Sequence, residues 1–176
     1  MSKDMKKEII SWMRTIVISI LMAMLMLQII QPTIVKETSM LPTLDPNNYL
    51  LLERVSYRMD KLGRGDIIVF KTDMVTENGK EKNLIKRIIG LPGDHVVIYG
   101  GKVVINEELL QEGYVNGEET DGNIDLIVDE GRFFVMGDNR EVSLDSRSPR
   151  VGLIESERVI GRAMVRLYPF GIMRKF

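Results

Sequence analysis

Cysteine is absent from the 176-residue chain, and histidine occurs once, as His95. The lack of cysteine excludes a thiol nucleophile, a disulfide framework and any zinc site built on thiolates. The single histidine excludes every site that needs two, which removes the common arrangements of zinc hydrolases. We therefore expect neither a metal nor another cofactor, and chemistry carried by hydroxyl, amine and carboxyl groups.

An excess of basic charge is also missing. The 24 Lys and Arg residues are balanced by 25 Asp and Glu residues, for a formal net charge of −1. This balance gives no positive field of the kind that attracts a polyanion, so nucleic acid is not an expected partner. Hydrophobic residues make up 44% of the chain and charged residues 28%, which is typical of a folded globular protein.

Only one apolar run is long enough to span a bilayer. No charge occurs from Thr15 to Ile30, and a helix from Trp12 to Ile30 would be about 28 Å long, close to the hydrocarbon thickness. A cleaved signal sequence is an alternative, but Gln28–Val35 offers no pair of small residues at the required spacing. A buried core helix is a further alternative. The prediction is an uncleaved anchor over residues 12–31.

Basic residues lie on one side of this run. Four of them precede or enter it, namely Lys3, Lys6, Lys7 and Arg14, whereas the first one after it is Lys36. The positive-inside tendency predicts a cytoplasmic basic arm at residues 1–11 and an extracytoplasmic domain at residues 32–176. We expect a single-pass protein of the cell membrane, in contact with membrane lipid.

The rest of the chain is typical of a β-rich domain. Short apolar runs bounded by turn residues predict strands at Tyr49–Leu52, Asp66–Phe70, Leu84–Ile89, Val96–Tyr99, Val103–Ile105, Ile124–Val128, Phe133–Met136 and Ala163–Leu167. Tight hairpins are predicted at Tyr99–Lys102 and Asp129–Arg132, and exposed loops at Thr72–Asn83 and Glu112–Asn123. The predicted fold class is mainly β, with one transmembrane helix followed by one β-rich domain.

Two polar segments could hold a site. Ser39 precedes Pro42 in a turn soon after the apolar run, which suits a nucleophile near the bilayer but equally suits a linker. Gly137–Arg140 is followed by Ser143, Asp145, Ser146 and Arg147, which indicates a hydrogen-bonded turn, with a plain polar loop as the alternative.

A third segment contains Lys86 and Arg87 side by side in a predicted strand. Side chains of a strand alternate between its two faces, so one of these cations points toward the apolar face. Burial lowers the pKa of a lysine toward that of a useful base. The alternative is an edge strand with both cations solvated, a common protection against aggregation.

Together these segments resemble the type I signal peptidase family. The chain carries SMLPT at 39–43, RGDIIVF at 64–70, KRIIGLPGD at 86–94 and GDNREVSLDSR at 137–147, in the order of the family's sequence boxes. The short stretch from Gly93 to Gly137 is similar to compact Gram-positive-type bacterial members. The resemblance implies a membrane-bound serine endopeptidase with a signal-peptidase-like catalytic domain, which removes signal peptides from secretory preproteins.

The resemblance also implies roles for individual residues. Ser39 matches the nucleophile and Lys86 its general base, while Ser143 matches a serine that helps to orient the lysine. Asp145 and Arg147 match a pair that supports the site. Met40 and Ile85 are our candidates for shaping the pockets that take small substrate residues.

A Ser/Lys dyad fits the residues available. A serine hydroxyl needs an adjacent base, and a lysine is a base only when neutral. At the reference pKa of about 10.4, roughly one lysine in 2,500 is neutral at pH 7, and lowering the pKa to about 8 requires about 3.3 kcal/mol, which desolvation can supply. We expect a structural or surface role for His95.

Two other functions compete with this one. A regulator-type Ser/Lys autopeptidase would carry an N-terminal DNA-binding domain where this chain has its apolar run. A catalytically inactive, membrane-tethered module that binds preproteins would have no need of both Ser39 and Lys86. Labelling of Ser39 by an acylating inhibitor distinguishes a catalyst from a binder.

One position departs from the family pattern. Glu37 stands where some members have a serine that donates a second hydrogen bond to the oxyanion. We expect either that Glu37 turns outward, to a cation such as Lys36 or to a partner at the lipid interface, or that the site uses backbone donors alone. The N–H of Ser39 is the candidate backbone donor.

Overall fold

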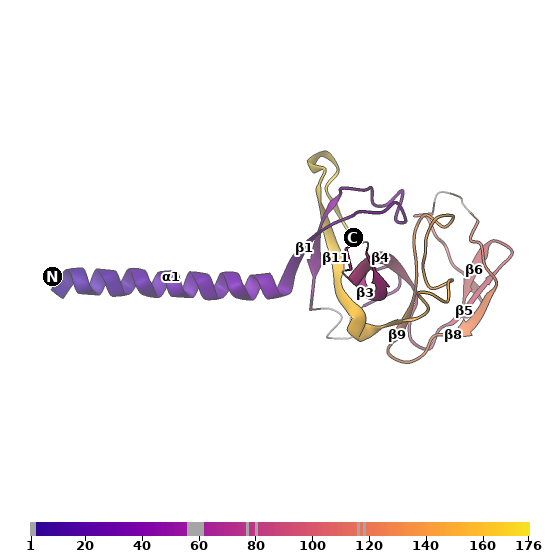
Figure 1. Cartoon of the computed structure of the whole chain (residues 1–176), viewed down its shortest axis with the longest axis horizontal. Coiled ribbons are helices and arrows are strands. Elements are labelled where there is room, and N and C mark those ends of the chain that lie inside the picture. Colours follow the sequence, from indigo (N-terminus) through magenta and orange to yellow (C-terminus); the bar gives the residue numbers. More distant parts are fainter. Residues whose placement is uncertain (1–2, 56–61, 77, 80, 116, 118) are drawn as a thin grey trace.

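A long helix projects from a β-rich domain in the computed structural model, which describes residues 3–55, 62–76, 78, 79, 81–115, 117 and 119–176. The helix α1 (Lys3–Ile29) is followed directly by strand β1 (Ile30–Ile34) (Figure 1). By length and composition, Met5–Ile29 is able to cross a membrane, and its most apolar stretch packs against no other part of the protein.

The helix bounds differ from those of the predicted anchor. The helix already includes Lys6, Lys7 and Glu8 of the basic arm, since these residues are good helix formers. It ends at Ile29 for two reasons. Pro32 disfavours a helical conformation in the residue that precedes this proline, and β-branched residues follow the helix. The last two positions of the predicted anchor therefore lie in β1.

The described strands form two sheets. The eight-stranded sheet has the order β1-β2-β11-β3-β4-β9-β10, with β12 paired to β11, and the four-stranded sheet has the order β7-β6-β5-β8. The larger sheet contains β2 (Tyr49–Glu53), β3 (Ile67–Val75), β4 (Glu81–Gly90), β9 (Arg132–Met136), β10 (Ile154–Glu155), β11 (Val159–Tyr168) and β12 (Arg174–Lys175). The smaller one contains β5 (His95–Tyr99), β6 (Lys102–Ile105), β7 (Glu108–Leu109) and β8 (Ile124–Ile127), and short 3-10 helices η2 (Ser156–Arg158) and η3 (Phe170–Ile172) complete the domain.

The predicted fold class is confirmed, and each predicted strand coincides with an observed one. The strands that sequence patterns missed are β1, β7, β10 and β12. The last three have two residues each, which is too short to produce an alternating pattern. In β1, Gln31, Pro32 and Thr33 separate Ile30 from Ile34, so the strand has no alternating apolar pattern.

One of the two predicted hairpins is confirmed. Tyr99 pairs with Lys102 across Gly100 and Gly101, which both have positive φ, as a tight turn between antiparallel strands requires. The turn at Asp129–Arg132 also forms, with a hydrogen bond from the Arg132 N–H to the Asp129 carbonyl. Its prediction as a hairpin is wrong, because β8 pairs with β5 and β9 pairs with β4 and β10. Turn residues specify the reversal of the chain but not the partners of its strands.

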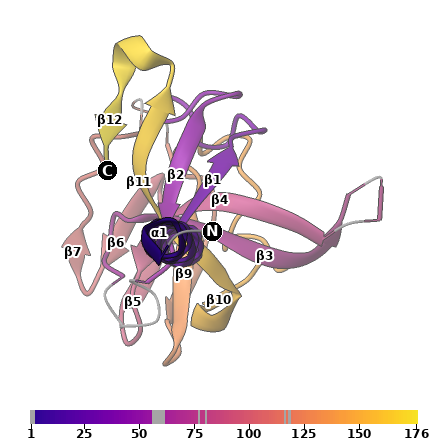
Figure 2. The ribbon, with the colours of Figure 1, turned by 90° about the vertical axis from the view of Figure 1, so that its left-hand side faces the viewer.

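The predicted exposed loop at Thr72–Asn83 is wrong over most of its described length. Strand β3 continues to Val75 and β4 begins at Glu81, and the resulting hairpin extends away from the body of the domain (Figure 2). Positions 77 and 80 lie outside the described residues. The predicted loop at Glu112–Asn123 is confirmed where the structure describes it, although Thr120 within it is buried.

Buried apolar residues fix the position of the segment that follows β1. Met40 and Leu44 are fully buried against Leu50 and Leu52 of β2. Burying two large side chains of this kind contributes a few kcal/mol. The segment that begins with Ser39 is therefore held by the core, although it has no regular secondary structure.

Candidate active site

Ser39 and Lys86 meet in the structure, although 47 positions separate them in the sequence. The Lys86 ammonium group donates a hydrogen bond to the Ser39 hydroxyl, with Nζ and Oγ 2.6 Å apart. Ser39 is 7% exposed and Lys86 is 1% exposed. Burial lowers the pKa of Lys86 to about 8, and the negative charge of Asp145 only partly opposes this effect. The pair therefore has both the contact and the basicity that a dyad needs.

Backbone hydrogen bonds hold Ser39 in place. The Leu41 N–H donates to the Thr38 carbonyl, which closes a turn around Ser39, and the Leu44 N–H donates to the Met40 carbonyl, which closes a second turn directly after it. The Asn139 N–H donates to the Ser39 carbonyl over 3.1 Å. The loop after β9 is thereby fixed to the serine.

Gly137 allows this close approach of the loop. A Cβ atom at position 137 would lie 2.2 Å from the Ser143 Oγ and 2.4 Å from the Ser39 carbonyl oxygen. Both distances are far below van der Waals contact, so only glycine fits here. The Gly137 N–H also donates to the Asp145 carboxylate.

Asp145 and Arg147 form the ion pair that the resemblance implied. The Arg147 guanidinium contacts both Asp145 oxygens, with Nε–Oδ1 2.9 Å and Nη2–Oδ2 3.0 Å. Arg147 also donates to the Arg140 and Asp121 carbonyls. The pair thus crosslinks the loop that supports Ser39.

Ser143 lies in the same loop, beside Gly137 and the Ser39 carbonyl. Its hydroxyl is buried and has no hydrogen-bond partner within the described part of the chain. The structure therefore brings Ser143 to the site without a bond to Lys86, and its role in orienting the lysine stays a prediction.

Arg87, the neighbour of Lys86, is also buried. Its guanidinium forms two hydrogen bonds with Asp138, at 2.8 Å and 2.5 Å, and donates to the Gly65 carbonyl. The Tyr114 ring lies 4.0 Å from the Arg87 Cζ. The alternative of an edge strand with two solvated cations is therefore wrong, because each face of β4 packs against other elements.

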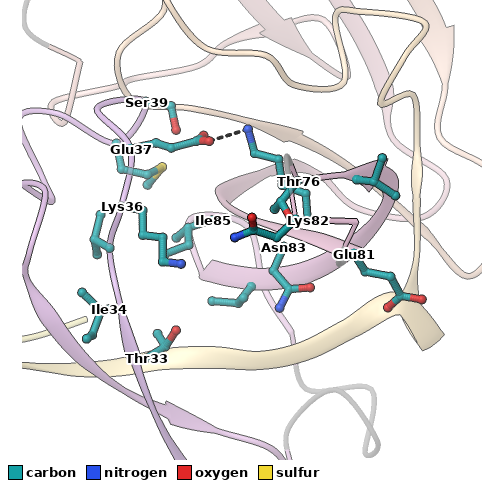
Figure 3. A pocket seen from close by; sticks show the side chains of 15 residues that line it. Thr33, Ile34, Lys36, Glu37, Ser39, Thr76, Glu81, Lys82, Asn83 and Ile85 are labelled. Atoms are coloured by element: carbon teal, nitrogen blue, oxygen red, sulfur yellow. Dashed lines mark ion pairs between the residues drawn. The ribbon is translucent and has the colours of Figure 1, made fainter.

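A groove of about 780 Å³ opens beside Ser39. One wall is the segment from Thr33 to Glu37 and the other is β4 from Glu81 to Ile85, with the end of the β3–β4 hairpin beyond (Figure 3). Met40 and Ile85, the candidates for the substrate pockets, both line it. The structure thus brings these two residues and Ser39 to one groove.

Glu37 crosses this groove. Its carboxylate forms an ion pair with Lys82 of β4, with Oε1 and Nζ 2.5 Å apart (Figure 3). Of the alternatives for Glu37, the structure shows an ion pair with a cation, and that cation is Lys82 rather than the suggested Lys36. Lys82 belongs to the segment predicted as a loop, so its position could not be inferred.

Comparisons with known proteins identify the family of the chain. The family model described as signal peptidase, peptidase S26, matches residues 9–168. This chain belongs to that family. The signal peptidase I of Bacillus licheniformis is 34% identical over 187 residues, covering 99% of this chain and 96% of the relative. The signal peptidase I S of Bacillus subtilis (strain 168) is 34% identical over 182 residues, covering 97% and 95%.

A solved structure is also similar. The crystal structure of a signal peptidase I from Enterococcus faecalis V583 is 31% identical, with a TM-score of 0.48, and covers 58% of this chain and 96% of that one. The resemblance to Gram-positive-type signal peptidases is confirmed by the full-length relatives in Bacillus. The chain is therefore a peptidase by family.

Sequence analysis did not predict a further buried ion pair of this peptidase. Arg140 is fully buried and forms an ion pair with Glu112, and its Nη1 also donates to the Thr120 hydroxyl. Glu112 accepts a further hydrogen bond from Tyr114, whose pKa is raised by burial. Partners 20 to 28 positions apart in two loops leave no local pattern in the sequence.

His95 lies away from this network, on β5 in the smaller sheet. Its Nε2 is 2.6 Å from the Asp125 Oδ1, and its side chain is 43% exposed, as a surface role requires. Among the residues that the structure describes, no group of three or more His, Asp or Glu is arranged to hold a metal.

Proposed function

We propose that this protein is a membrane-anchored serine endopeptidase that removes signal peptides from secretory preproteins with a Ser39/Lys86 dyad. The observation that carries the proposal is the 2.6 Å contact between the buried Ser39 hydroxyl and Lys86 amine at the edge of a groove. The full-length relatives named signal peptidase I support the substrate class.

The proposed reaction is acyl transfer in two steps. Neutral Lys86 accepts the Ser39 proton while Oγ attacks the scissile carbonyl. The resulting ammonium group protonates the leaving amine, and an acyl-enzyme remains. Lys86 then accepts a proton from water, which attacks the ester and releases Ser39 with its proton restored.

The oxyanion needs hydrogen-bond donors during both steps. The Ser39 N–H donates to no other group in the described residues, so it is available for this role. The Glu37 carboxylate is directed to Lys82, and no hydroxyl donor stands at that position. The proposal therefore uses a backbone donor at the oxyanion.

The substrate is expected to bind as an added strand. Among the described strands, β1 pairs with β2 alone and β4 pairs with β9 only from Arg87 onward, so each wall of the groove includes a strand edge without a partner there. An extended peptide can add beside residues 34–37 and 83–86 by main-chain hydrogen bonds. Met40 and Ile85 would then restrict the side chains beside the scissile bond to small ones.

The proposed topology places residues 1–11 in the cytoplasm, residues 12–31 in the membrane and residues 32–176 outside it. Basic residues before the apolar segment support this orientation. Protease added to intact protoplasts should digest the domain after residue 31 and spare a tag at the N-terminus. A domain protected from outside would reverse the orientation.

A preprotein cleavage assay in detergent tests the activity. Wild type should release a mature protein of the correct N-terminus, whereas Ser39→Ala and Lys86→Ala should release none. An acylating serine inhibitor should label Ser39 in wild type. Folded wild-type protein that binds a preprotein but neither cleaves it nor takes up the inhibitor would be a binding module instead.

A further inference from the structure

Two side-chain contacts cross the groove next to each other. Ser39 contacts Lys86, and Glu37 contacts Lys82, so residues two apart on one wall meet residues four apart on the other. We call the Glu37–Lys82 ion pair the strap. Its side chains are 47% and 35% exposed, whereas Ser39 and Lys86 are buried, so the strap is the more solvent-exposed of the two contacts. Figure 3 shows the strap beside Ser39.

The strap connects a stretch of chain that has few other ties. The Val35 N–H donates to the Asn48 carbonyl, and the Ser39 carbonyl accepts from Asn139. Between these points, the Thr38 carbonyl accepts from the Leu41 N–H and from the Asn139 side chain, and the strap adds the link to β4. Lys82 itself sits on a fixed strand, because its carbonyl accepts a 2.7 Å hydrogen bond from the Thr72 hydroxyl. The strap thus holds the residues just before Ser39 against the strand that carries Lys86.

The strap also places two opposite charges near Lys86. The charged groups that face Lys86 come from three places. They are Asp145 and Asp138 from the loop after β9, Glu37 from the segment just before Ser39, and Lys82 from β4 itself. Asp145 is neutralised by Arg147, and Asp138 by Arg87. Glu37 and Lys82 form an ion pair with each other, and they act on Lys86 in opposite directions: the Glu37 carboxylate raises the pKa of Lys86 and the Lys82 ammonium group lowers it by less.

We propose that Glu37 and Lys82 are positioning residues, whose ion pair holds the residues just before Ser39 against β4 and presents Lys86 with two charges that oppose each other. This inference rests on the proposed Ser39/Lys86 dyad and adds a second pair of residues to it. Loss of one partner leaves an uncompensated charge beside the base, and loss of both removes the field of the strap altogether.

The two single variants should act in opposite directions. Lys82→Gln leaves the Glu37 anion, which favours charged Lys86, so the alkaline limb of kcat/KM should move to higher pH. Glu37→Gln leaves the Lys82 cation, so the limb should move to lower pH. Each shift should be about half a pH unit at low salt and should shrink in 1 M salt, because the strap is partly solvated. The double variant should return close to the wild-type limb.

The experiment measures kcat/KM against pH in detergent, with one neutral peptide substrate that the wild type cleaves. The control variant is Lys102→Gln, which removes an exposed cation from β6 in the smaller sheet, away from the groove, and its limb should match wild type. Opposite shifts in the two single variants support the strap. Limbs that coincide with wild type, or that move in the same direction, overturn it, whatever the loss of overall rate.

A second readout separates the strap from the dyad. The Lys86 Cε resonance of 13C-lysine-labelled protein, assigned by its loss in Lys86→Met, reports the pKa of this group without turnover. Cleavage by Lys86→Ala would refute the dyad, irrespective of the strap. Inactive Lys86→Ala together with an unmoved Lys86 titration in Glu37→Gln and Lys82→Gln would refute the strap alone.

Discussion

The two faces of strand β4 hold adjacent buried cations in opposite circumstances. On one face, Arg87 has two hydrogen bonds to Asp138, a third to a backbone carbonyl and an aromatic ring beside it. On the other face, Lys86 forms no ion pair within the described residues, and its hydrogen bond goes to the neutral hydroxyl of Ser39.

We call Arg87 the structural cation, because its partners keep it charged, and Lys86 the chemical cation, because its surroundings suit it to proton transfer. A buried charge with a bidentate partner remains charged and fixes the chain segments on either side of it. A buried amine without such a partner is destabilised in its charged form, so it can release and accept a proton near neutral pH. Guanidinium cannot do this at any usable pH, which is why the two positions are not interchangeable.

The largest effect on activity should come from replacing Lys86 by arginine, the residue type of the structural cation. We expect Lys86→Arg to lower kcat/KM for preprotein cleavage at least about 1,000-fold, since the side chain stays charged. The Ser39→Ala/Lys86→Ala double variant should be no slower than either single variant, because the two residues act as one unit. Cleavage by Lys86→Arg at more than a tenth of the wild-type rate would contradict the dyad.

Removing Asp138, the partner of Arg87, should lower the free energy of unfolding rather than block proton transfer directly. Asp138→Ala leaves Arg87 charged and buried, which should lower the free energy of unfolding by about 3–5 kcal/mol. Denaturant unfolding in detergent measures this loss. A matched Arg87→Met/Asp138→Leu variant should lose less, and a loss below about 1 kcal/mol in Asp138→Ala would mean that the pair is not structural.

Removing the chemical cation should have the opposite effect on stability. The pKa of Lys86 is lowered from 10.5 to about 8 in the folded protein, so the unfolded chain binds more protons between these values. At pH 7 this buried charge costs about 3 kcal/mol, and Lys86→Met should be more stable by up to that amount. The gain should decrease as pH rises from 8 to 10.5 and vanish above that range. A variant that is less stable than wild type at pH 7 would contradict the unpaired state of Lys86.

The smallest effect should be seen in the pH profile when His95 is replaced. The wild-type kcat/KM should rise with pH through a midpoint near 8, where the pKa of Lys86 lies, because the neutral amine is the active form. His95→Gln should leave that midpoint unchanged. A limb that moves or disappears in His95→Gln would assign the base to the histidine.

Features that depend on neighbouring residues were predictable from the sequence. The apolar runs predicted β2 to β6, β8, β9 and β11. The motifs indicated Ser39 and Lys86 as site residues, and the two are in contact. The turn at Gly100–Gly101 was equally clear, since its conformation is a property of two residues.

Features that depend on distant contacts were not predictable in the same way. Nothing near Arg87 or Arg140 in the sequence indicates Asp138 or Glu112 as a partner. The turn at Asp129–Arg132 gave no sign that it joins two sheets. Lys82 could not be predicted as the partner of Glu37, because the polar residues of Thr72–Asn83 gave no sign that β3 and β4 pair there.

The direct passage from α1 into β1 has a mechanical consequence. The Arg54 N–H bonds to the carbonyl of Ile29, the last helical residue, so the junction is braced by the start of the loop after β2. Since β1 has five residues, the groove that begins at its end stands no more than about 17 Å beyond the helix. In the proposed topology, with α1 in the bilayer, the groove would therefore lie at a fixed height above the membrane surface. A preprotein anchored in the same bilayer would bring its cleavage site to Ser39 only when its own exposed stretch matches that height.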